Sequence, residues 1–163
     1  MKKSDIISQK ILPLSELARQ SERWRFLNKT VAFTNGCFDI LHQGHIFSLA
    51  QAALEADYLI VGLNDDSSVR RLKGAGRPIN HVESRALVLA SLFMVDAVVV
   101  FEEDTPLALI RALTPNVLIK GGDYTVDEIV GAGDVIASGG RVVINPILEG
   151  FSTSALIEKI HRL

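Results

Sequence analysis

Residues 31–45 read VAFTNGCFDILHQGH, and this stretch joins an apolar strand to a helix. Its first four residues form a short apolar run of the kind that makes a buried strand. Beyond the loop, apolar residues recur at the spacing of one helix face: Ile46, Leu49, Ala50, Ala53 and Leu54. A strand that passes through a glycine turn into a helix is the repeating unit of α/β folds.

The same alternation continues toward the C-terminus. Further strands are predicted at 58–63, 97–101, 117–119 and 141–145. Helices are predicted at about 83–93 with Asn80 as the cap, from Thr105 to near Pro115, before Gly139, and from Ser154 onward. Strands separated by helices form a parallel sheet covered on both faces, and ligands bind at the carboxyl ends of its strands. The loops after the strands therefore form the candidate site.

The composition is that of one folded domain. The 163 residues are 48% hydrophobic and 22% charged, with a net charge of -2, which argues against a general nucleic-acid binder. No apolar run approaches the roughly 20 residues that span a bilayer, and no signal peptide is evident. With a single cysteine as well, we expect a cytoplasmic protein that does not bind membranes. Residues 1–29 are expected to form a helical lead-in, broken at Pro13, before an α/β domain over 30–163.

The loop after the first strand has the features of an anion site. Gly36 permits close approach of the backbone to a ligand, and the next helix begins near Gly44 with its free N–H groups pointing into the loop. His42 and His45 project from this helix start and can donate hydrogen bonds to a phosphate. Two other interpretations are core packing with one ring solvated, and a metal pair, although helical metal pairs usually lie four residues apart. Cys37 has no evident third group to activate it, so we do not interpret it as a nucleophile.

Five cations follow the second strand within sixteen residues: Arg70, Arg71, Lys73, Arg77 and Arg85. A local excess of positive charge in an acidic chain attracts anions, whereas a solvated helix face is the alternative. The position after a strand and the glycines beside Lys73 favour a phosphate-binding role for Lys73 and Arg85. For Arg70 and Arg71 the two interpretations stay open.

Two later segments also follow strands. The first contains Lys120, Gly121, Gly122 and Asp123, which offer a cation, close backbone approach and a hydroxyl acceptor. Such a turn alone is weak support for a site. The second contains Ser152, Thr153 and Ser154, hydroxyl residues suited to capping the last helix.

The motifs NGCFD at 35–39 and HQGH at 42–45 resemble the signature of the cytidylyltransferase-like superfamily of nucleotidyltransferases. The resemblance implies a Rossmann-like, three-layer α/β/α fold with a five-stranded parallel sheet. Within that superfamily the chain is similar to the heptose 1-phosphate adenylyltransferases from Thr30 onward. The shared segments include RLKG at 71–74, EEDTP at 102–106 and KGGDY at 120–124. Phe151 departs from that subgroup, which tends to have cysteine there.

This resemblance implies transfer of AMP from ATP to D-glycero-β-D-manno-heptose 1-phosphate, giving pyrophosphate and ADP-heptose for the lipopolysaccharide inner core. It implies Mg²⁺ bound through the nucleotide phosphates, with no metal site made by the protein. The implied catalytic residues are His42, His45, Lys73 and Arg85. The implied nucleotide-binding residues are Thr34, Asn35, Gly36, Cys37, Phe38, Asp39, Gly44, Lys120, Gly121, Gly122, Asp123, Ser152, Thr153 and Ser154. Asp39 is expected to brace the loop, and Asn64, Asp65 and Arg77 are assigned to the sugar phosphate.

Several alternatives stay open. One is a cytidylyltransferase acting on a polyol phosphate such as glycerol 3-phosphate, and another is a non-catalytic nucleotide-binding module. A fragment of an aminoacyl-tRNA synthetase is disfavoured because the chain is short and has no Lys-Met-Ser-Lys-Ser-like loop. The residues alone do not determine the base, the acceptor or the oligomeric state, and a homodimer is one option.

Overall fold

A single sheet organises the computed structural model, which describes residues 3–148 and 150–162. Its strands are β1 (Val31–Gly36), β2 (Tyr58–Asn64), β3 (Ala97–Phe101), β4 (Val117–Gly121) and β5 (Arg141–Asn145). The helices are α1 (Lys3–Ser8), α2 (Leu14–Phe26), α3 (Gln43–Ala53), α4 (Asp66–Lys73), α5 (Val82–Ser91), α6 (Leu107–Leu113), α7 (Ala132–Ala137) and α8 (Thr153–His161), with a 3-10 turn η1 (Val126–Glu128). The predicted strands are all present, at nearly the predicted bounds.

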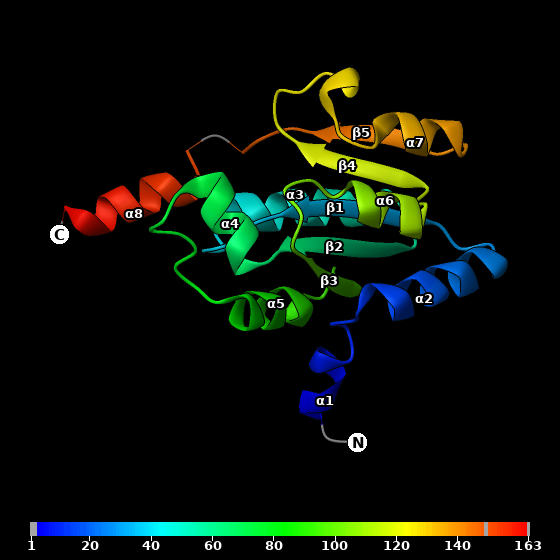
Figure 1. Cartoon of the computed structure of the whole chain (residues 1–163), viewed down its shortest axis with the longest axis horizontal. Coiled ribbons are helices and arrows are strands. Elements are labelled where there is room, and N and C mark those ends of the chain that lie inside the picture. The colour runs from blue at the N-terminus through cyan, green and yellow to red at the C-terminus, as the bar shows by residue number, and fades with distance from the viewer. Residues whose placement is uncertain (1–2, 149, 163) are drawn as a thin grey trace.

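The strands lie in the order β3-β2-β1-β4-β5, and every neighbouring pair is parallel (Figure 1). The chain builds outward from β1 to β3 and then crosses to the other side of β1 for β4 and β5. This change of direction separates the loops that follow β1 and β4, and an open α/β sheet binds ligands in the resulting crevice. The predicted Rossmann-like parallel fold is confirmed.

Helices cover both faces of the sheet, as predicted. On one face, α2, α6 and α7 pack through residues such as Leu17 and Leu113 against Phe33 of β1. On the other, α3 and α5 pack through residues such as Leu49 and Leu89. Burial of each such large side chain contributes about 1.5–3 kcal/mol. The close packing limits side-chain size as well, since a Cβ at Gly62 would lie 2.8 Å from the Phe33 ring.

The lead-in passes around the β3 edge of the sheet. It breaks at Pro13, as predicted, and Pro13 becomes the N-cap of α2. Just before the break, the amide of Val98 donates to the carbonyl of Lys10 over 2.8 Å, and the amide of Leu12 donates to the carbonyl of Val98 over 2.9 Å. These bonds cover part of an edge strand that would otherwise be open to pairing. The domain boundary at residue 30 stays a prediction.

Two local expectations were wrong. The sequence predicts no helix between the strand at 58–63 and the helix near residue 83, but residues 66–73 form helix α4, whose N-cap Asp65 accepts a hydrogen bond from the amide of Ser68. The N-cap of α5 is His81 and not Asn80, because Asn80 is held by the loop that contains Asp39. Among the helices of the described ranges, none is long and apolar enough to cross a membrane.

Candidate functional site

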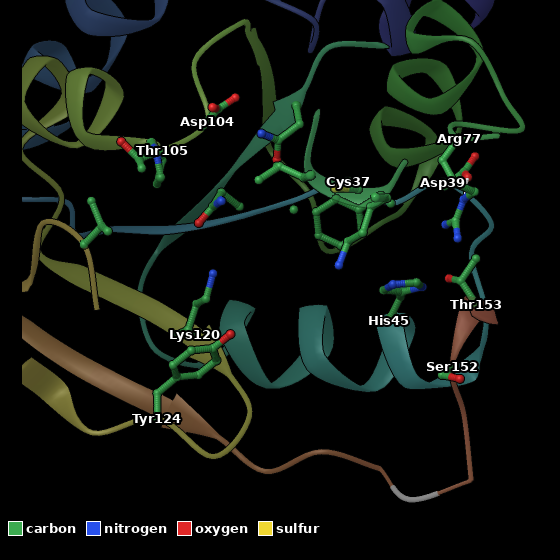
Figure 2. A pocket seen from close by; sticks show the side chains of 18 of the residues that line it. Cys37, Asp39, His45, Arg77, Asp104, Thr105, Lys120, Tyr124, Ser152 and Thr153 are labelled. Atoms are coloured by element: carbon green, nitrogen blue, oxygen red, sulfur yellow. Dashed lines mark hydrogen bonds and ion pairs between the residues drawn. The ribbon is translucent and has the colours of Figure 1, made fainter. Parts of the chain in front are cut away.

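A cleft opens at the carboxyl ends of β1 and β4, at the change of strand direction (Figure 2). It consists of two adjoining cavities of about 680 and 290 Å³, here called the larger and the smaller lobe. Ligand sites in proteins usually measure about 300–1,000 Å³. The wall that both lobes share consists of Asn35, Gly36, Cys37, Phe38, His42, His45, Lys120, Tyr124 and Phe151.

The structure brings most of the predicted site residues to this cleft. The larger lobe adds Asp39, Asn64, Lys73, Arg77, Ser152, Thr153 and Ser154 to the shared wall. The smaller lobe adds Thr34, Gly44 and Gly121. Three segments that are far apart in the chain, at 34–45, 120–124 and 151–154, therefore meet around one space.

His42 and His45 stack at the start of α3, with ring centroids 3.9 Å apart. The amide of His42 donates to Nδ1 of His45 over 3.4 Å. Burial, and then the neighbouring His42, lower the pKa of His45 to about 4, and burial also lowers the pKa of His42. Both imidazoles are therefore neutral near pH 7. The Nδ1 atom of His42 is buried without a hydrogen-bond partner in the described residues, which leaves one polar atom at this helix start unsatisfied.

Asp39 braces the loop, as expected. Its buried carboxylate accepts hydrogen bonds from the amides of Ile79 and Asn80 at 2.8–2.9 Å and from Nε of Arg77 at 2.5 Å. Burial opposes ionisation of Asp39, but these donors outweigh it, so the pKa of the carboxyl group is lowered. Arg77 lines the larger lobe and forms an ion pair with Asp39. The loop after β1, which contains Asp39, therefore positions the Arg77 side chain.

Arg85 is not brought to the cleft. Its side chain is 2% exposed and lies behind the loop. The guanidinium donates to the carbonyls of Asn80 (2.9 Å), Cys37 (2.5 Å) and Asn64 (2.9 Å) and to the carboxylate of Asp66 (2.8 Å). These partners come from three separate segments: the loop after β1, the junction of β2 and α4, and the loop before α5. The geometry therefore supports a structural role for Arg85 in place of the direct phosphate contact expected from the sequence.

Asp65, Gly122 and Asp123 also lie outside the two lobes. The carboxylate of Asp65 is occupied as the cap of α4, where it accepts from the amide of Ser68 over 2.7 Å. Asp123 is exposed at the surface. Gly122 has a φ of 125°, a left-handed conformation that suits glycine, and it brings the backbone past the ring of Tyr124. The structure thus gives no support to ligand contacts by these three residues.

The start of α8 forms the far side of the larger lobe. Ser152 caps this helix by accepting a hydrogen bond from the amide of Ala155 over 3.0 Å. The hydroxyl of Thr153 donates to the carbonyl of Ile40 over 3.4 Å, which ties α8 to the loop after β1. Two helix starts, those of α3 and α8, therefore lie at one cleft, and each offers free N–H groups to an anion.

Cys37 lines both lobes, but its thiol is poorly suited to act as a nucleophile. Burial raises its pKa, although the positive charges of Lys73, Arg85 and Arg77 partly oppose this. A raised pKa keeps the sulfur protonated near neutral pH, and the thiolate is the reactive form. The structure is consistent with the sequence-based view that Cys37 is not catalytic.

Several lining residues have no role that the sequence predicts. In the larger lobe these are Leu72, Asp104, Thr105, Pro106, Leu118, Tyr124, Glu128, Ile129, Val130 and Phe151. Asp104, Thr105 and Pro106 follow β3, and Tyr124 and Glu128 follow β4, so their positions after strands were a usable signal. The signal was not sufficient, because the path of a long loop after a strand is not fixed by the pattern of the sequence.

Comparison with known proteins gives a consistent result. The cytidylyltransferase-like family model matches residues 33–159. The chain is 56% identical over 150 residues to the bifunctional protein HldE of Mesorhizobium japonicum, which covers 92% of this chain and 30% of that protein. It is 53% identical over 156 residues to the bifunctional protein HldE of Koribacter versatilis, which covers 96% of this chain and 32% of that protein. The chain thus spans about a third of the length of these curated relatives.

Two solved structures share the fold. The lipopolysaccharide core biosynthesis protein of Thermoplasma volcanium superposes with a TM-score of 0.60 and 28% identity, over 74% of this chain and 97% of that one. The pantoate-beta-alanine ligase of Francisella tularensis superposes with a TM-score of 0.61 and 16% identity, over 94% of this chain and 78% of that one. The second likeness concerns the fold alone.

Proposed function

Because this chain belongs to the cytidylyltransferase-like family, we propose that it is a nucleotidyltransferase that transfers AMP from ATP to D-glycero-β-D-manno-heptose 1-phosphate. The products are ADP-heptose and pyrophosphate, and the product serves the lipopolysaccharide inner core. The observation that carries the proposal is the stacked pair His42 and His45 in the wall shared by two lobes. A reaction that joins two phosphorylated substrates needs two adjoining spaces with phosphate-binding groups between them.

The two lobes differ in a way that suits two different substrates. The smaller lobe is bounded partly by backbone and apolar groups, including Gly121, Pro146 and Ile147, which suit a nucleoside. The larger lobe carries Asn64, Asp104 and other polar side chains, which suit the hydroxyl groups of a sugar. We place the nucleoside in the smaller lobe and the sugar in the larger one, so that the phosphates of both lie at the shared wall.

The chemistry is a direct displacement at phosphorus. A phosphate oxygen of the sugar 1-phosphate attacks the α-phosphorus of ATP, the bond from that phosphorus to the oxygen leading to the β-phosphate breaks, and pyrophosphate leaves. The attacking phosphate monoester is already anionic near pH 7, so no general base is required. Catalysis then consists of positioning and of stabilising charge. His42, His45 and the starts of α3 and α8 donate hydrogen bonds to phosphate oxygens.

We infer that Mg²⁺ is held by the phosphates of the nucleotide. Among residues 3–148 and 150–162, no group of three or more His, Cys, Asp or Glu side chains is arranged to hold a metal ion. The carboxylate of Asp39, the acidic group in the loop after β1, is occupied by Arg77 and by backbone amides. With the carboxylate of Asp39 occupied, the cleft fits a cation that arrives already bound to the nucleotide, as Mg²⁺ commonly does. When bound, Mg²⁺ offsets negative charge on the leaving pyrophosphate. A cytoplasmic location and a homodimer stay predictions.

The experiment is a screen of pyrophosphate release. Purified protein is incubated with each of four nucleoside triphosphates and with a panel of phosphorylated acceptors in the presence of Mg²⁺. We expect the fastest release with ATP and heptose 1-phosphate, and none with heptose 7-phosphate. Faster release with CTP and glycerol 3-phosphate would move the function to a polyol cytidylyltransferase. Nucleotide binding without release for any acceptor would indicate a non-catalytic module.

A further inference from the structure

Lys120 occupies an unusual position in the cleft. It lies near the end of β4, and its side chain extends into the space beside the ring of Tyr124 (Figure 2). Its Nζ atom lies 5.5 Å from the centroid of that ring. Both lobes are lined by Lys120, and among the described residues no other lysine or arginine lines both.

The charge of Lys120 has no carboxylate partner in the part of the chain that the structure describes. Arg71 and Arg77 are paired there with Asp104 and Asp39. Lys120 instead contacts the face of Tyr124. Burial lowers the pKa of its ammonium group, Cys37 acts in the opposite direction, and the positive charge of Lys73 lowers it further. A partly buried cation that shares a lobe with a second cation is costly to maintain, and an anion bound in that lobe would relieve that cost.

We propose that Lys120 is a catalytic residue that contacts phosphate groups of both substrates where the two lobes meet, and that Tyr124 is the residue that positions it. This inference rests on the proposed function. Two anionic phosphates repel each other as the new bond forms, and a cation between them reduces that repulsion most at the shortest separation, in the transition state. Lys73 lines the larger lobe alone, so Lys120 is better placed than Lys73 to contact both substrates.

Tyr124 suits the positioning role. An ammonium group above an aromatic face is attracted to it, so the ring holds the lysine without neutralising its charge as a carboxylate would. The ring lies against the backbone at Gly122, where a Cβ would lie 3.0 Å from Cε2 of Tyr124. The phenol oxygen is not required for this contact, so Tyr124→Phe is expected to retain more activity than Tyr124→Leu.

The test compares Lys120→Ala, Lys120→Arg, Tyr124→Phe and Tyr124→Leu with the wild type. The matched control is Lys29→Ala, which removes an exposed lysine that is paired with Asp57 and precedes β1, at the opposite end of the sheet. With ATP and heptose 1-phosphate, kcat should fall about 10²–10³-fold in Lys120→Ala, by analogy with the loss of one oxyanion donor. Lys120→Arg should recover at least part of that loss. Tyr124→Leu should lose about tenfold, Tyr124→Phe should lose clearly less than Tyr124→Leu, and Lys29→Ala should stay close to wild type.

A binding measurement separates this inference from the proposed function. ATP and heptose 1-phosphate are titrated separately by calorimetry, and Lys120→Ala should weaken each by about tenfold or more, as expected for loss of a charged hydrogen bond. Weaker binding of one substrate alone, or of neither, overturns the inference. A kcat for Lys120→Ala within threefold of an active wild type also overturns it. If the wild type releases no pyrophosphate with any acceptor, the proposed function fails, and the two titrations still decide whether Lys120 contacts both ligands.

Discussion

The backbone amide of His42 donates to Nδ1 of His45, and this contact determines which nitrogen of His45 carries the proton. An imidazole nitrogen that accepts a hydrogen bond carries no proton, so the proton of neutral His45 lies on Nε2. The ring lines both lobes, which makes Nε2–H a donor available to a phosphate oxygen. The helix start thus sets the tautomer and the position of its own catalytic group.

His45→Ala and His42→Ala should each fold normally and lose turnover by about 10²–10³-fold, because each removes one donor to a phosphate whose charge rises in the reaction. Pyrophosphate release per folded molecule, with circular dichroism as the measure of folding, checks this. His81→Ala is the matched control, because His81 lies outside the two lobes and pairs with Asp66 at the surface. Turnover like that of the wild type in either cleft variant would contradict the assigned role.

The depressed pKa of His45 predicts a stability that depends on pH. With the folded value at about 4 and the ordinary value at 6.5, the unfolded chain binds the additional proton between these values. The free energy of unfolding should therefore fall as the pH falls from 6.5 toward 4. Chemical denaturation at pH 7 and pH 5 measures this decrease, which should be smaller in His45→Gln. An equal decrease in the wild type and the variant would show that His45 does not titrate in this way.

Arg85→Ala and Lys73→Ala should have different effects: the first should lower stability, and the second should lower activity. Arg85→Ala leaves the carboxylate of Asp66 without its buried cation, and breaking such a pair costs about 3 kcal/mol of unfolding free energy. Lys73 is exposed at the end of α4, so its loss should change stability by no more than about 0.5 kcal/mol. It should instead lower kcat/KM by about tenfold. Thermal unfolding and enzyme kinetics on both variants test this difference. A loss of stability in Lys73→Ala together with a loss of activity alone in Arg85→Ala would show that the two roles are exchanged.

Much of the fold could be predicted from the periodicity of apolar residues. The position of the Arg85 side chain could not be predicted in this way. Apolar runs at strand length are informative because a parallel sheet buries both faces of its strands. The cations after β2 gave the right region, but the sequence could not separate Lys73 in the cleft from Arg85 behind the loop. That distinction depends on where four carbonyl and carboxylate groups from different segments converge. Asp65 is a similar case, since its position after a strand suits a ligand contact and a helix cap equally well.

Gly44→Ala, at the start of α3, should lower activity while it leaves stability nearly unchanged. Alanine favours a helix over glycine by up to about 1 kcal/mol, but a Cβ at this position would lie 3.0 Å from Cε1 of His42 and 3.2 Å from Cβ of Phe151. The His42 ring must then move, so turnover should fall by about ten- to a hundredfold while the melting temperature changes little. Gly133→Ala in α7 is the control, because a Cβ there meets no atom within 4 Å and should only stabilise the helix. If Gly44→Ala retained full turnover, the position of His42 would not be critical for the reaction.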